Sequence, residues 1–404
     1  MTSYVKKIKK TKKTKKIKKL YVASKSVKKG GKAIASGGYG CVFRPALHCD
    51  KSTSSLPYNP KYVSKLMFNR HAESELDEID KVKAYVSSIP NASKYFLVEN
   101  TNSCKPAYLT KPHLLGFNKK CKSLVKKGYN KKNINMNLHK FKIINIPDGG
   151  RDIDKFWELL GNKRLQLRRE DFADIFSNTN TALVDLLENA IVPLNKKGYL
   201  HLDVKGQNIL RQGPFLSKDI FVRLIDWGLS DSIPKSGIPE VLENRVIQFN
   251  IPFSNILFST DALSSKIKTY ITELQESKKN DELSLLARKQ IMKIVAYKFL
   301  KDVEANRGTG HIEYVEHIVK KTYIHHKLSL HGIGGPSKVF NATSIITDYL
   351  AAILEKYCDK AGNFNKDLYF HEVFKHNVDV WGFIMAYSSI LEKKNASNKD
   401  EITI

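Results

Sequence analysis

Two short polar clusters constrain this chain more than any other part of its sequence. The first spans residues 201–208 (HLDVKGQN) and the second spans residues 224–228 (LIDWG). Apolar residues around Leu200–Leu210 and Phe221–Ile225 predict two short strands beside these clusters. The sequence therefore places both polar clusters in loops at the ends of buried strands.

The residues of the two clusters suit the transfer of a charged chemical group. Asp203 can accept or orient a hydroxyl proton. Asn208 and, 18 residues later, Asp226 can hold a metal ion. Lys205 can neutralise charge on a transferred phosphoryl group, and Gly228 allows a sharp turn after the second carboxylate. This order of residues predicts a phosphoryl-transfer site.

A glycine-rich turn precedes these clusters by more than a hundred residues. It comprises Ser36, Gly37, Gly38, Tyr39, Gly40, Cys41 and Val42. Gly37 and Gly40 would let the backbone approach phosphate groups and adopt positive φ, and Val42 would pack on an adenine face. Ala35 stands where a G-x-G-x-x-G pattern has its first glycine, so a plain hairpin is the competing interpretation.

A lysine in the next expected strand is the candidate phosphate contact. The strand covers Tyr62–Leu66, and Lys65 would meet α- and β-phosphates as a point charge. A carboxylate must hold this lysine, and the predicted helix Ser74–Val86 offers Glu75 and Glu78. Glu75 borders the apolar stripe of that helix and is the preferred partner, with Glu78 second.

Residues 33–147 have the pattern of a small, strand-rich domain. Further strands are expected at Tyr95–Val98 and Phe141–Ile144. Between them, residues 118–140 contain eight Lys and no acidic residue. This basic insert is expected to form an exposed hairpin or loop.

Residues 148–404 are mainly helical in pattern. Apolar residues at helical spacing between Leu183 and Leu194 predict a helix that Gly198 ends. Residues 255–370 are expected to form a helical insert. The predicted fold class is therefore α+β, with a small β-rich N-terminal lobe and a larger helical C-terminal lobe.

The first 32 residues form a lysine-rich tail. They contain 14 Lys and no Asp, Glu or Arg, which is half of the net charge of +28. Such a segment repels itself and cannot bury a core, so it is predicted to be disordered. It is either an electrostatic handle for nucleic acid or an acidic partner, or a solvated tail without a partner.

Cysteine usage and hydropathy bear on the compartment. The five Cys are scattered and form no CxxC pair, which predicts neither a disulfide framework nor a zinc site and favours a reducing compartment. The sequence has no run of about 18 apolar residues, so no membrane span is expected. No signal peptide is recognised at the N-terminus, and an intracellular location is expected.

The two clusters resemble the catalytic motifs of eukaryotic-type Ser/Thr protein kinases. HLDVKGQN resembles the H-R-D-x-K-x-x-N loop, and DWG resembles D-F-G. The resemblance implies ATP and Mg²⁺ as cofactors and protein hydroxyls as acceptors. It makes Asp203 the catalytic base and makes Asn208 and Asp226 the Mg²⁺ ligands, while Lys205 marks the Ser/Thr type.

The same resemblance covers residues 33–254 and resumes at Asn377–Gly382. It implies that Lys65 is the strand-3 lysine and that Glu75 is its helix partner. It also implies that Ile144–Gly150 is the hinge that binds adenine through backbone groups. In the late segment (NVDVWG), Asp379 is expected to hydrogen-bond the backbone of the catalytic loop, residues 201–208.

Departures from the pattern are as informative as the matches. Leu202 replaces the Arg of H-R-D, which predicts activity without phosphorylation of the activation segment, residues 229–251. No A-P-E motif follows, and about 125 residues separate Pro252 from Asp379. We therefore expect residues 255–370 to supply helices to the C-terminal lobe. These features resemble the divergent kinases of large DNA viruses, which implies host cytoplasm, nucleus or virion.

Two other functions remain open from the sequence. One is a small-molecule or lipid kinase on the same fold, and the other is a weakly active pseudokinase scaffold led by the lysine-rich tail. His311 and the pair His325-His326 fall in the helical insert without supporting Cys or carboxylate spacing. Surface or capping roles are expected for these histidines, rather than metal binding.

Overall fold

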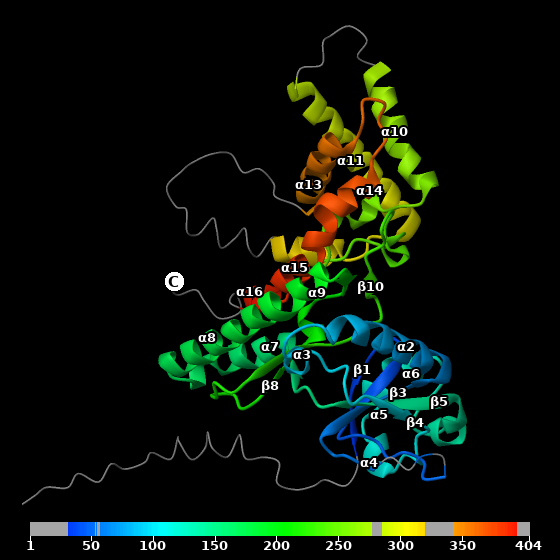
Figure 1. The fold of residues 1–404 in the computed structure, drawn as a ribbon, viewed down its shortest axis with the longest axis vertical. Helices are drawn as coiled ribbons and strands as arrows, with labels where there is room; N and C mark the ends of the chain where they lie inside the picture. The colour runs from blue at the N-terminus through cyan, green and yellow to red at the C-terminus, as the bar shows by residue number, and fades with distance from the viewer. Residues whose placement is uncertain (1–30, 53, 55–56, 277–284, 320–341, 394–404) are drawn as a thin grey trace, which may run out of the picture. The chain divides into compact units, whose positions relative to one another are not determined.

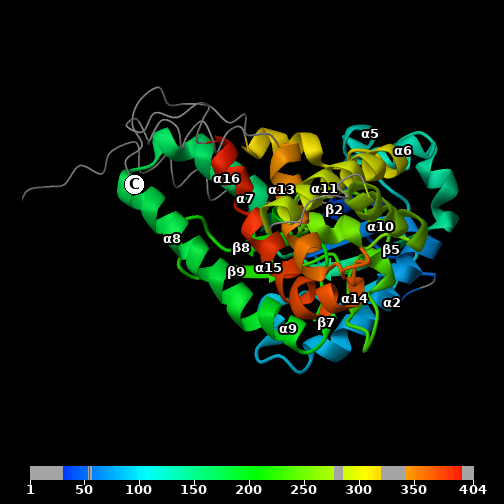
Figure 2. The same cartoon turned by 90° about the horizontal axis from the view of Figure 1, so that it is seen from above.

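The structure is a computed structural model, and it describes residues 31–52, 54, 57–276, 285–319 and 342–393 (Figures 1 and 2). The chain forms two compact units. The described residues up to Ser74 and residues 100–148 make the smaller unit, and residues 75–99 and the described residues from Gly149 onward make the larger unit. All but two residues of the predicted lysine-rich tail lie outside the described residues.

Five antiparallel strands form the sheet of the smaller unit, in the order β1-β2-β3-β5-β4. They are β1 (Lys32–Ser36), β2 (Gly40–Arg44), β3 (Tyr62–Phe68), β4 (Asn102–Cys104) and β5 (Phe141–Pro147). Lys65 pairs with Val42 on one side and with Ile144 on the other. Directly paired residues share a face of a sheet, so these three side chains line one face.

The opposite face of this sheet is covered by short helices. These are α4 (Lys111–Leu114), α5 (Phe117–Lys120), α6 (Lys122–Lys126) and the 3₁₀ helix η1 (Ile134–Lys140). The expectation that residues 118–140 form an exposed hairpin or loop is therefore wrong. Leu124 and Ile134 are fully buried in the core of the smaller unit, while the lysines face outward. Because the helical turns are short and irregular, their apolar residues show no sustained period.

Two disulfides join distant parts of the smaller unit, which corrects the expectation of no disulfide framework. Cys41 is bonded to Cys121, and Cys49 is bonded to Cys104. The bonds span 80 and 55 residues, so local cysteine spacing carries no trace of them. Cys358 is free and buried. Disulfides persist in oxidising surroundings, so the argument for a reducing compartment loses its support.

The expected strand at Tyr95–Val98 is also wrong. Residues Ala92–Tyr95 form helix α3, and Phe96 makes only an isolated bridge to Leu224. These residues are apolar because they are buried in the core of the larger unit, not because they belong to the sheet. The short apolar run was therefore ambiguous between a strand and another buried segment.

Helix α2 (Asn69–Val86) begins in the smaller unit and continues into the larger one. Its residues Ile79, Val82 and Val86 pack in the core of the larger unit. This burial explains why residues 75–99 group with the larger unit, although the sequence assigned them to the range 33–147.

A series of helices begins the C-terminal part of the larger unit. It consists of α7 (Ile153–Lys163), η2 (Arg164–Gln166), α8 (Arg169–Leu186), the π-helical turn η3 (Leu187–Ile191) and α9 (Val192–Lys196). The predicted apolar stripe is confirmed, because Leu183, Ala190 and Leu194 are buried. Gly198 adopts φ 87° just after the helix, as a C-terminal glycine should.

Short strands hold the loops that follow. They are β6 (Arg151–Asp152), β7 (Tyr199–Leu200), β8 (Ile209–Gln212), β9 (Phe221–Leu224) and β10 (Asp231–Ser232). One sheet has the order β6-β8-β9, and β10 pairs with β7. Ile209 pairs with Leu224, so the residue before β8 and the residue after β9 lie at the same end of the ladder.

The rest of the larger unit is helical. Its elements are η5 (Glu240–Leu242), η6 (Phe253–Leu257), α10 (Asp261–Glu276), α11 (Leu285–Arg307), α13 (Ala342–Tyr357), α14 (Lys366–Tyr369), the π-helical turn η7 (Phe370–Phe374), α15 (Lys375–Met385) and α16 (Ser388–Lys393). Helices α10, α11 and α13 lie together (Figure 1) and bury a core against η6. Trp381 of α15 packs on the same core. The described part of residues 255–370 is thus docked on the residues before and after it.

At the coarse level the fold class is as predicted: a small antiparallel sheet and a larger helical part in one mixed α and β chain. Within the ranges that the structure describes, we find no helix with both the length and the apolar character needed to cross a bilayer.

Candidate active site

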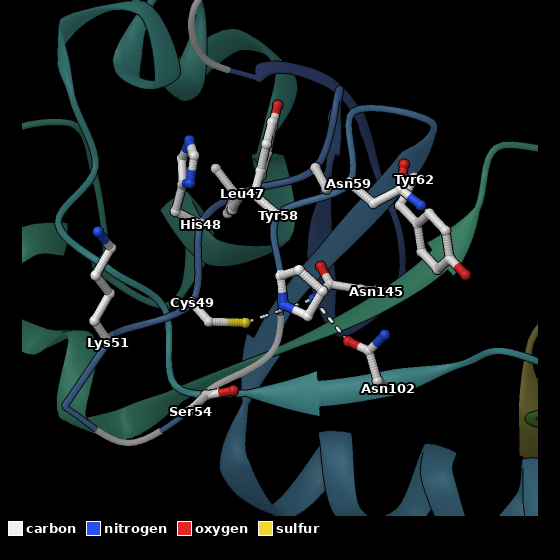
Figure 3. Close-up of a pocket in the computed structure, with 12 residues that line it drawn as sticks. Leu47, His48, Cys49, Lys51, Ser54, Tyr58, Asn59, Tyr62, Asn102 and Asn145 are labelled. Carbon is white, nitrogen blue, oxygen red and sulfur yellow. Dashed lines mark hydrogen bonds between the residues drawn. The ribbon is translucent and has the colours of Figure 1, made fainter.

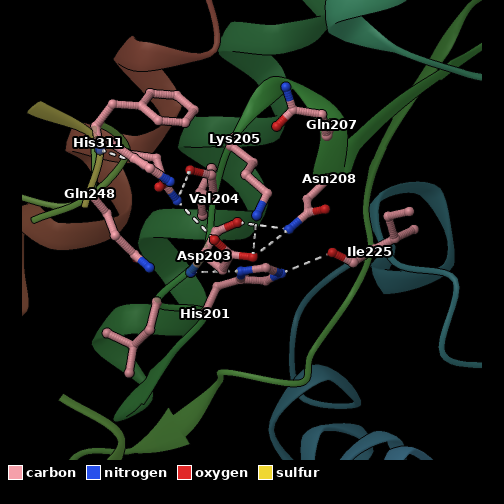
Figure 4. Close-up of polar contacts among 12 residues, drawn as sticks. His201, Asp203, Val204, Lys205, Gln207, Asn208, Ile225, Gln248 and His311 are labelled. Atoms are coloured by element: carbon pink, nitrogen blue, oxygen red, sulfur yellow. Dashed lines mark hydrogen bonds and ion pairs between the residues drawn. The ribbon is translucent and has the colours of Figure 1, made fainter. Parts of the chain in front are cut away.

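Asp203 lies at the centre of a buried group of polar side chains after β7 (Figure 4). Lys205 Nζ donates to Asp203 Oδ2 at 2.7 Å, and Asn208 Nδ2 donates to the same oxygen at 3.0 Å. Asn250 Nδ2 donates to the other carboxylate oxygen, Oδ1, at 2.9 Å. The structure thus brings together Asp203, Lys205 and Asn208, which the sequence singled out. It adds Asn250, which no sequence motif predicted.

Two hydrogen bonds from the amide nitrogen of Asn208 orient its side chain. This nitrogen also donates to the backbone oxygen of Asp203 at 2.9 Å, and the side-chain oxygen of Asn208 takes part in neither bond. The backbone N–H of Ile225 donates to the backbone oxygen of Asn208 at 2.9 Å, and Asp226 follows directly with an exposed side chain. An amide oxygen and a carboxylate at one end of the β8–β9 ladder are the oxygen ligands that Mg²⁺ prefers.

Asp379 of α15 holds the backbone of the loop at residues 201–208 through hydrogen bonds. Its Oδ2 accepts the backbone N–H of His201 at 2.8 Å, and its Oδ1 accepts that of Leu202 at 2.8 Å. Asn195 Nδ2 adds a third hydrogen bond, at 2.7 Å. Asp379 is 1% exposed, so these bonds satisfy a buried carboxylate. The expected contact between this residue and the loop backbone is confirmed.

Leu202 occupies a strained position between two anchors. It is a fully buried non-glycine residue with φ 59°, a conformation that costs of order 1–3 kcal/mol. Asp379 holds its N–H, and Arg245 Nη1 donates to its carbonyl oxygen at 3.1 Å. Asp226, whose side chain is exposed, also has a positive φ, of 71°. Backbone strain thus occurs at both polar clusters.

Arg245 brings a cation to the catalytic loop from the segment that follows Gly228. Besides the contact with Leu202, its Nη2 donates to Gln248 Oε1 at 2.6 Å. Burial lowers the pKa of Arg245 to about 10, although the charges of Asp203 and Asp379 oppose this shift. The loop that lacks the Arg of H-R-D therefore receives a guanidinium from another part of the chain.

Asn250 and α15 meet at the same loop. Asn250 Nδ2 lies 3.3 Å from the backbone oxygen of Val204, which it reaches in addition to Asp203. Gly382 packs so closely on the carbonyl oxygens of Val204 and Asn250 that a Cβ atom would overlap them. Glycine is thus required in the NVDVWG segment for packing, and not for an unusual φ.

His201 and Trp227 fix the two clusters against each other. The Nδ1 of His201 accepts the backbone N–H of Asp203 at 3.3 Å, and its Nε2 lies 3.1 Å from the carbonyl oxygen of Ile225. The ring of Trp227, which is 5% exposed, lies 4.8 Å from that of His201 and 5.7 Å from that of Phe96. An aromatic residue after Asp226 thus packs the carboxylate-bearing turn onto the core.

His311 reaches this region from the helical insert. Its backbone N–H donates to Ile247 O at 2.9 Å, and its Nδ1 accepts the backbone N–H of Phe249 at 3.4 Å. Removal from water and the charge of Lys205 lower the pKa of His311, and Asp203 opposes them. The pair His325-His326 lies outside the described residues. Among the residues with defined positions, no group of three or more His, Cys, Asp or Glu side chains could hold a metal.

The glycine-rich turn belongs to the smaller unit. Gly37 N–H donates to Gly40 O at 3.0 Å and closes the turn. Contrary to expectation, Gly37 and Gly40 do not adopt positive φ. Gly40 is needed because a Cβ atom there would overlap the carbonyl oxygen of Leu66 on β3. Close strand packing thus requires a glycine at position 40, whereas a Cβ atom at Gly38 would meet no atom within 4 Å.

Residues of the basic insert, 118–140, contact this turn, and no sequence motif predicted the contact. Ser123 Oγ donates to Gly40 O at 2.9 Å, and Ser123 N–H donates to Ser36 Oγ at 3.0 Å. One residue beyond Gly40, the Cys41–Cys121 disulfide attaches β2 to the residue just before α6. Helix α6 and the disulfide therefore fix the entry and the exit of the turn.

Lys65 and its candidate partners lie in different units. A Cβ atom at Gly37 would lie 3.6 Å from Cε of Lys65, so the lysine extends along the turn. Glu75 and Glu78 are partly buried on the portion of α2 in the larger unit. Glu78 Oε2 would lie 3.5 Å from a Cβ atom at Gly228. The pairing of Lys65 with either carboxylate stays a prediction.

No protein-family model matches the chain. No curated protein matches it either. The candidate active site is therefore defined by its own residues and their contacts.

A cavity of about 300 Å³ lies on the covered face of the sheet in the smaller unit (Figure 3). Two of its polar lining residues pair with each other, since Asn145 Nδ2 donates to Asn102 Oδ1 at 3.1 Å, and Asn145 Oδ1 also accepts the hydroxyl of buried Ser64 at 2.5 Å. Side chains alternate between faces along a strand, so Asn145 points away from the face of Ile144 and Lys65. This cavity does not extend the face that carries Lys65.

Proposed function

We propose that this chain is a protein kinase-like enzyme that transfers the γ-phosphoryl group of ATP to Ser or Thr hydroxyls of protein substrates. The observation that carries the proposal is the hydrogen-bonded arrangement of Lys205 and Asn208 around Asp203. The anchoring of the loop by Asp379 supports it, because that contact follows from the same resemblance. The small sheet and larger helical part are compatible with a bilobal kinase-like fold.

Asp203 would act on the substrate hydroxyl. It orients the O–H and accepts its proton as the hydroxyl oxygen bonds to the γ-phosphorus of ATP. The bond between that phosphorus and the β-γ bridging oxygen breaks, and ADP leaves. Lys205 balances the charge of the phosphoryl group in transit. Asn250 holds the second carboxylate oxygen, which fixes the direction of the first.

Each unit contributes candidate residues for the cofactors. The side-chain oxygen of Asn208 and the carboxylate of Asp226 suit Mg²⁺, which would neutralise phosphate oxygens when bound. Val42, Lys65 and Ile144 share one face of the sheet and suit a nucleotide. The phosphates would follow the glycine-rich turn, with Glu75 or Glu78 as the carboxylate for Lys65.

Protein substrates rather than small molecules are inferred mainly from Lys205 and from the NVDVWG segment. The intracellular location, the viral type and a nucleic-acid or acidic partner for the lysine-rich tail belong to the same proposal. The two disulfides of the smaller unit bear on the location, because reducing compartments open such bonds.

The test is a transfer assay with the full chain, ATP and Mg²⁺ on parallel protein and small-molecule panels, with phosphosites mapped. Asp203→Asn should lower kcat roughly 10²–10⁴-fold, the usual contribution of a general base. Asp226→Ala should lose Mg²⁺-dependent transfer. Asp174→Asn, an exposed change on α8, is the matched control and should leave activity intact.

Each other outcome points to a different function. Transfer confined to the small-molecule or lipid panel would replace the protein-kinase proposal with the small-molecule alternative. Absence of transfer, with cellular function unchanged by Asp203→Asn, would identify a scaffold. Phosphorylated tyrosine as the main product would contradict the assignment based on Lys205.

A further inference from the structure

A second cavity of the smaller unit, of about 440 Å³, is lined mainly by cations. Its lining residues are Phe68, Asn69, Arg70, Lys127 and Lys140. They come from the end of β3, the start of α2, the turn after α6 and the end of η1. This cavity contains none of the residues assigned to the candidate active site.

The three cations of this cavity are not neutralised. Within the described ranges, no carboxylate forms an ion pair with Arg70, Lys127 or Lys140, whereas nearby Lys142 pairs with Glu73 at 3.1 Å. The local field is positive enough to act on a neighbour. Partial burial, and then the charges of Arg70 and Lys127, lower the pKa of His71. The positive charge of this cavity is therefore available to an anionic group from outside the chain.

Aromatic rings, and not acids, hold two of the cations in place. Lys127 Nζ lies 5.1 Å from the ring centroid of Phe68, and Lys140 Nζ lies 5.7 Å from that of Tyr129. The rings of Phe68 and Tyr129 pack edge to face at 5.3 Å. Cation–π contacts position an ammonium group without neutralising its charge. Both lysines therefore remain able to attract an anion.

We propose that this cavity binds the phosphoryl group of a phosphorylated Ser or Thr side chain on a protein partner. A phosphomonoester carries close to two negative charges at neutral pH, whereas each phosphate of a nucleic acid carries one. Three cations that line one cavity match the former, since a nucleic acid needs cations spaced along a track. Phe68 gives the attached peptide an apolar contact. The site does not depend on the proposed phosphoryl transfer.

Lys127 connects this site to the glycine-rich turn within the smaller unit. Its ammonium lies 5.7 Å from the ring centroid of Tyr39, which stacks on His71 at 4.3 Å. A phosphopeptide that draws Lys127 toward the cavity would change what Tyr39 packs against. This contact gives the site an optical readout, because Tyr39 is 58% exposed and accessible to substitution by Trp.

The test is fluorescence anisotropy of the full chain with degenerate peptides fixed at phosphoserine, Ser or Glu. The Lys127→Ala/Lys140→Ala double variant should weaken phosphopeptide binding roughly 10-fold or more, as expected for lost charge-assisted hydrogen bonds. The matched control is Lys119→Ala/Lys131→Ala, which removes the same charge from exposed positions of the insert outside the cavity. Its affinity should stay close to that of wild type.

Four results would overturn the proposal. Equal affinities of the two double variants for the phosphopeptide would mean non-specific electrostatic attraction. The lysine-rich tail, which all variants retain, is one source of such attraction. Equal affinity for Ser and phosphoserine peptides would exclude a phosphoryl site. Inorganic phosphate that binds as tightly as the phosphopeptide would identify a free-anion pocket. A single-stranded oligonucleotide that competes more strongly than the phosphopeptide would identify a nucleic-acid surface.

Discussion

The carboxylate of Asp379 accepts the backbone N–H of Leu202 at 2.8 Å and so ties α15 to the residue before Asp203. Leu202 is buried with a left-handed backbone, a conformation that a leucine does not hold without support. The same carboxylate accepts the N–H of His201. A late helix of the chain therefore maintains the geometry of a loop about 175 residues earlier in the sequence.

Asp379→Asn should damage both stability and turnover. One oxygen of the carboxylate is replaced by a donor that faces a backbone N–H, so a buried hydrogen bond is lost. The free energy of unfolding should fall by roughly 1–3 kcal/mol, measured by chemical denaturation. Displacement of the loop should lower kcat on the order of 10²-fold. Asp348→Asn, which breaks an exposed ion pair with Lys293, should change neither quantity appreciably.

Transfer activity should not depend on phosphorylation of residues 229–251. Leu202 offers no guanidinium for an activation-segment phosphate, and Arg245 and Asn250 already hold this segment against the catalytic loop. Phosphatase-treated and untreated samples should therefore have the same kcat in the transfer assay. A large loss on treatment, restored by rephosphorylation at a site within 229–251, would contradict the prediction.

The polar cluster at residues 201–208 was recognisable because its information is local. Asp203, Lys205 and Asn208 lie within six residues, and their order alone indicates their chemistry. Arg245 and Asn250 were missed because a single Arg or Asn in an irregular segment carries no periodic or motif signal. Their role depends on how residues 243–251 fold back on the loop, which only the three-dimensional structure contains.

The strands next to the glycine-rich turn were also predictable, but the cover of the sheet was not. The eight lysines of residues 118–140 suggested a solvated loop, yet Leu124 and Ile134 bury in the core between them. Composition averages over such a segment and hides a few buried positions. The disulfides escaped for a related reason, since tertiary folding brings their cysteines together across 55 and 80 residues.

Thiol counting should verify both disulfides. Without reductant, the native protein should expose no reactive thiol, because the free Cys358 is buried and its burial raises its pKa to about 12. Denaturation without reductant should expose one thiol, and denaturation with reductant should expose all five. Five thiols in the unreduced, denatured protein would show that the chain folds and persists in the reduced state.

The environment of His311 should make stability depend on pH in mildly acidic solution. Its pKa is lowered in the folded chain, so the unfolded state binds more protons between that lowered pKa and about 6.5, the usual value for His. Stability should therefore rise as pH increases through this window. His311→Gln should flatten that part of the curve in denaturation experiments, whereas His376→Gln, an exposed change on α15, should leave it unaltered. Equal curves for wild type and His311→Gln would contradict the assignment.

The Cys41–Cys121 disulfide should control nucleotide affinity, because it fixes the exit of the glycine-rich turn. Replacing both cysteines by Ser should raise the KM for ATP and leave kcat at saturating ATP nearly unchanged, since the catalytic loop lies in the other unit. The matched control is the double Ser variant of Cys49 and Cys104, which removes a disulfide from the same unit without touching the turn. Both variants should lose stability, typically about 2–5 kcal/mol for a lost disulfide. Only the first should raise the KM, so an equal rise in both would reduce the effect to general destabilisation of the smaller unit.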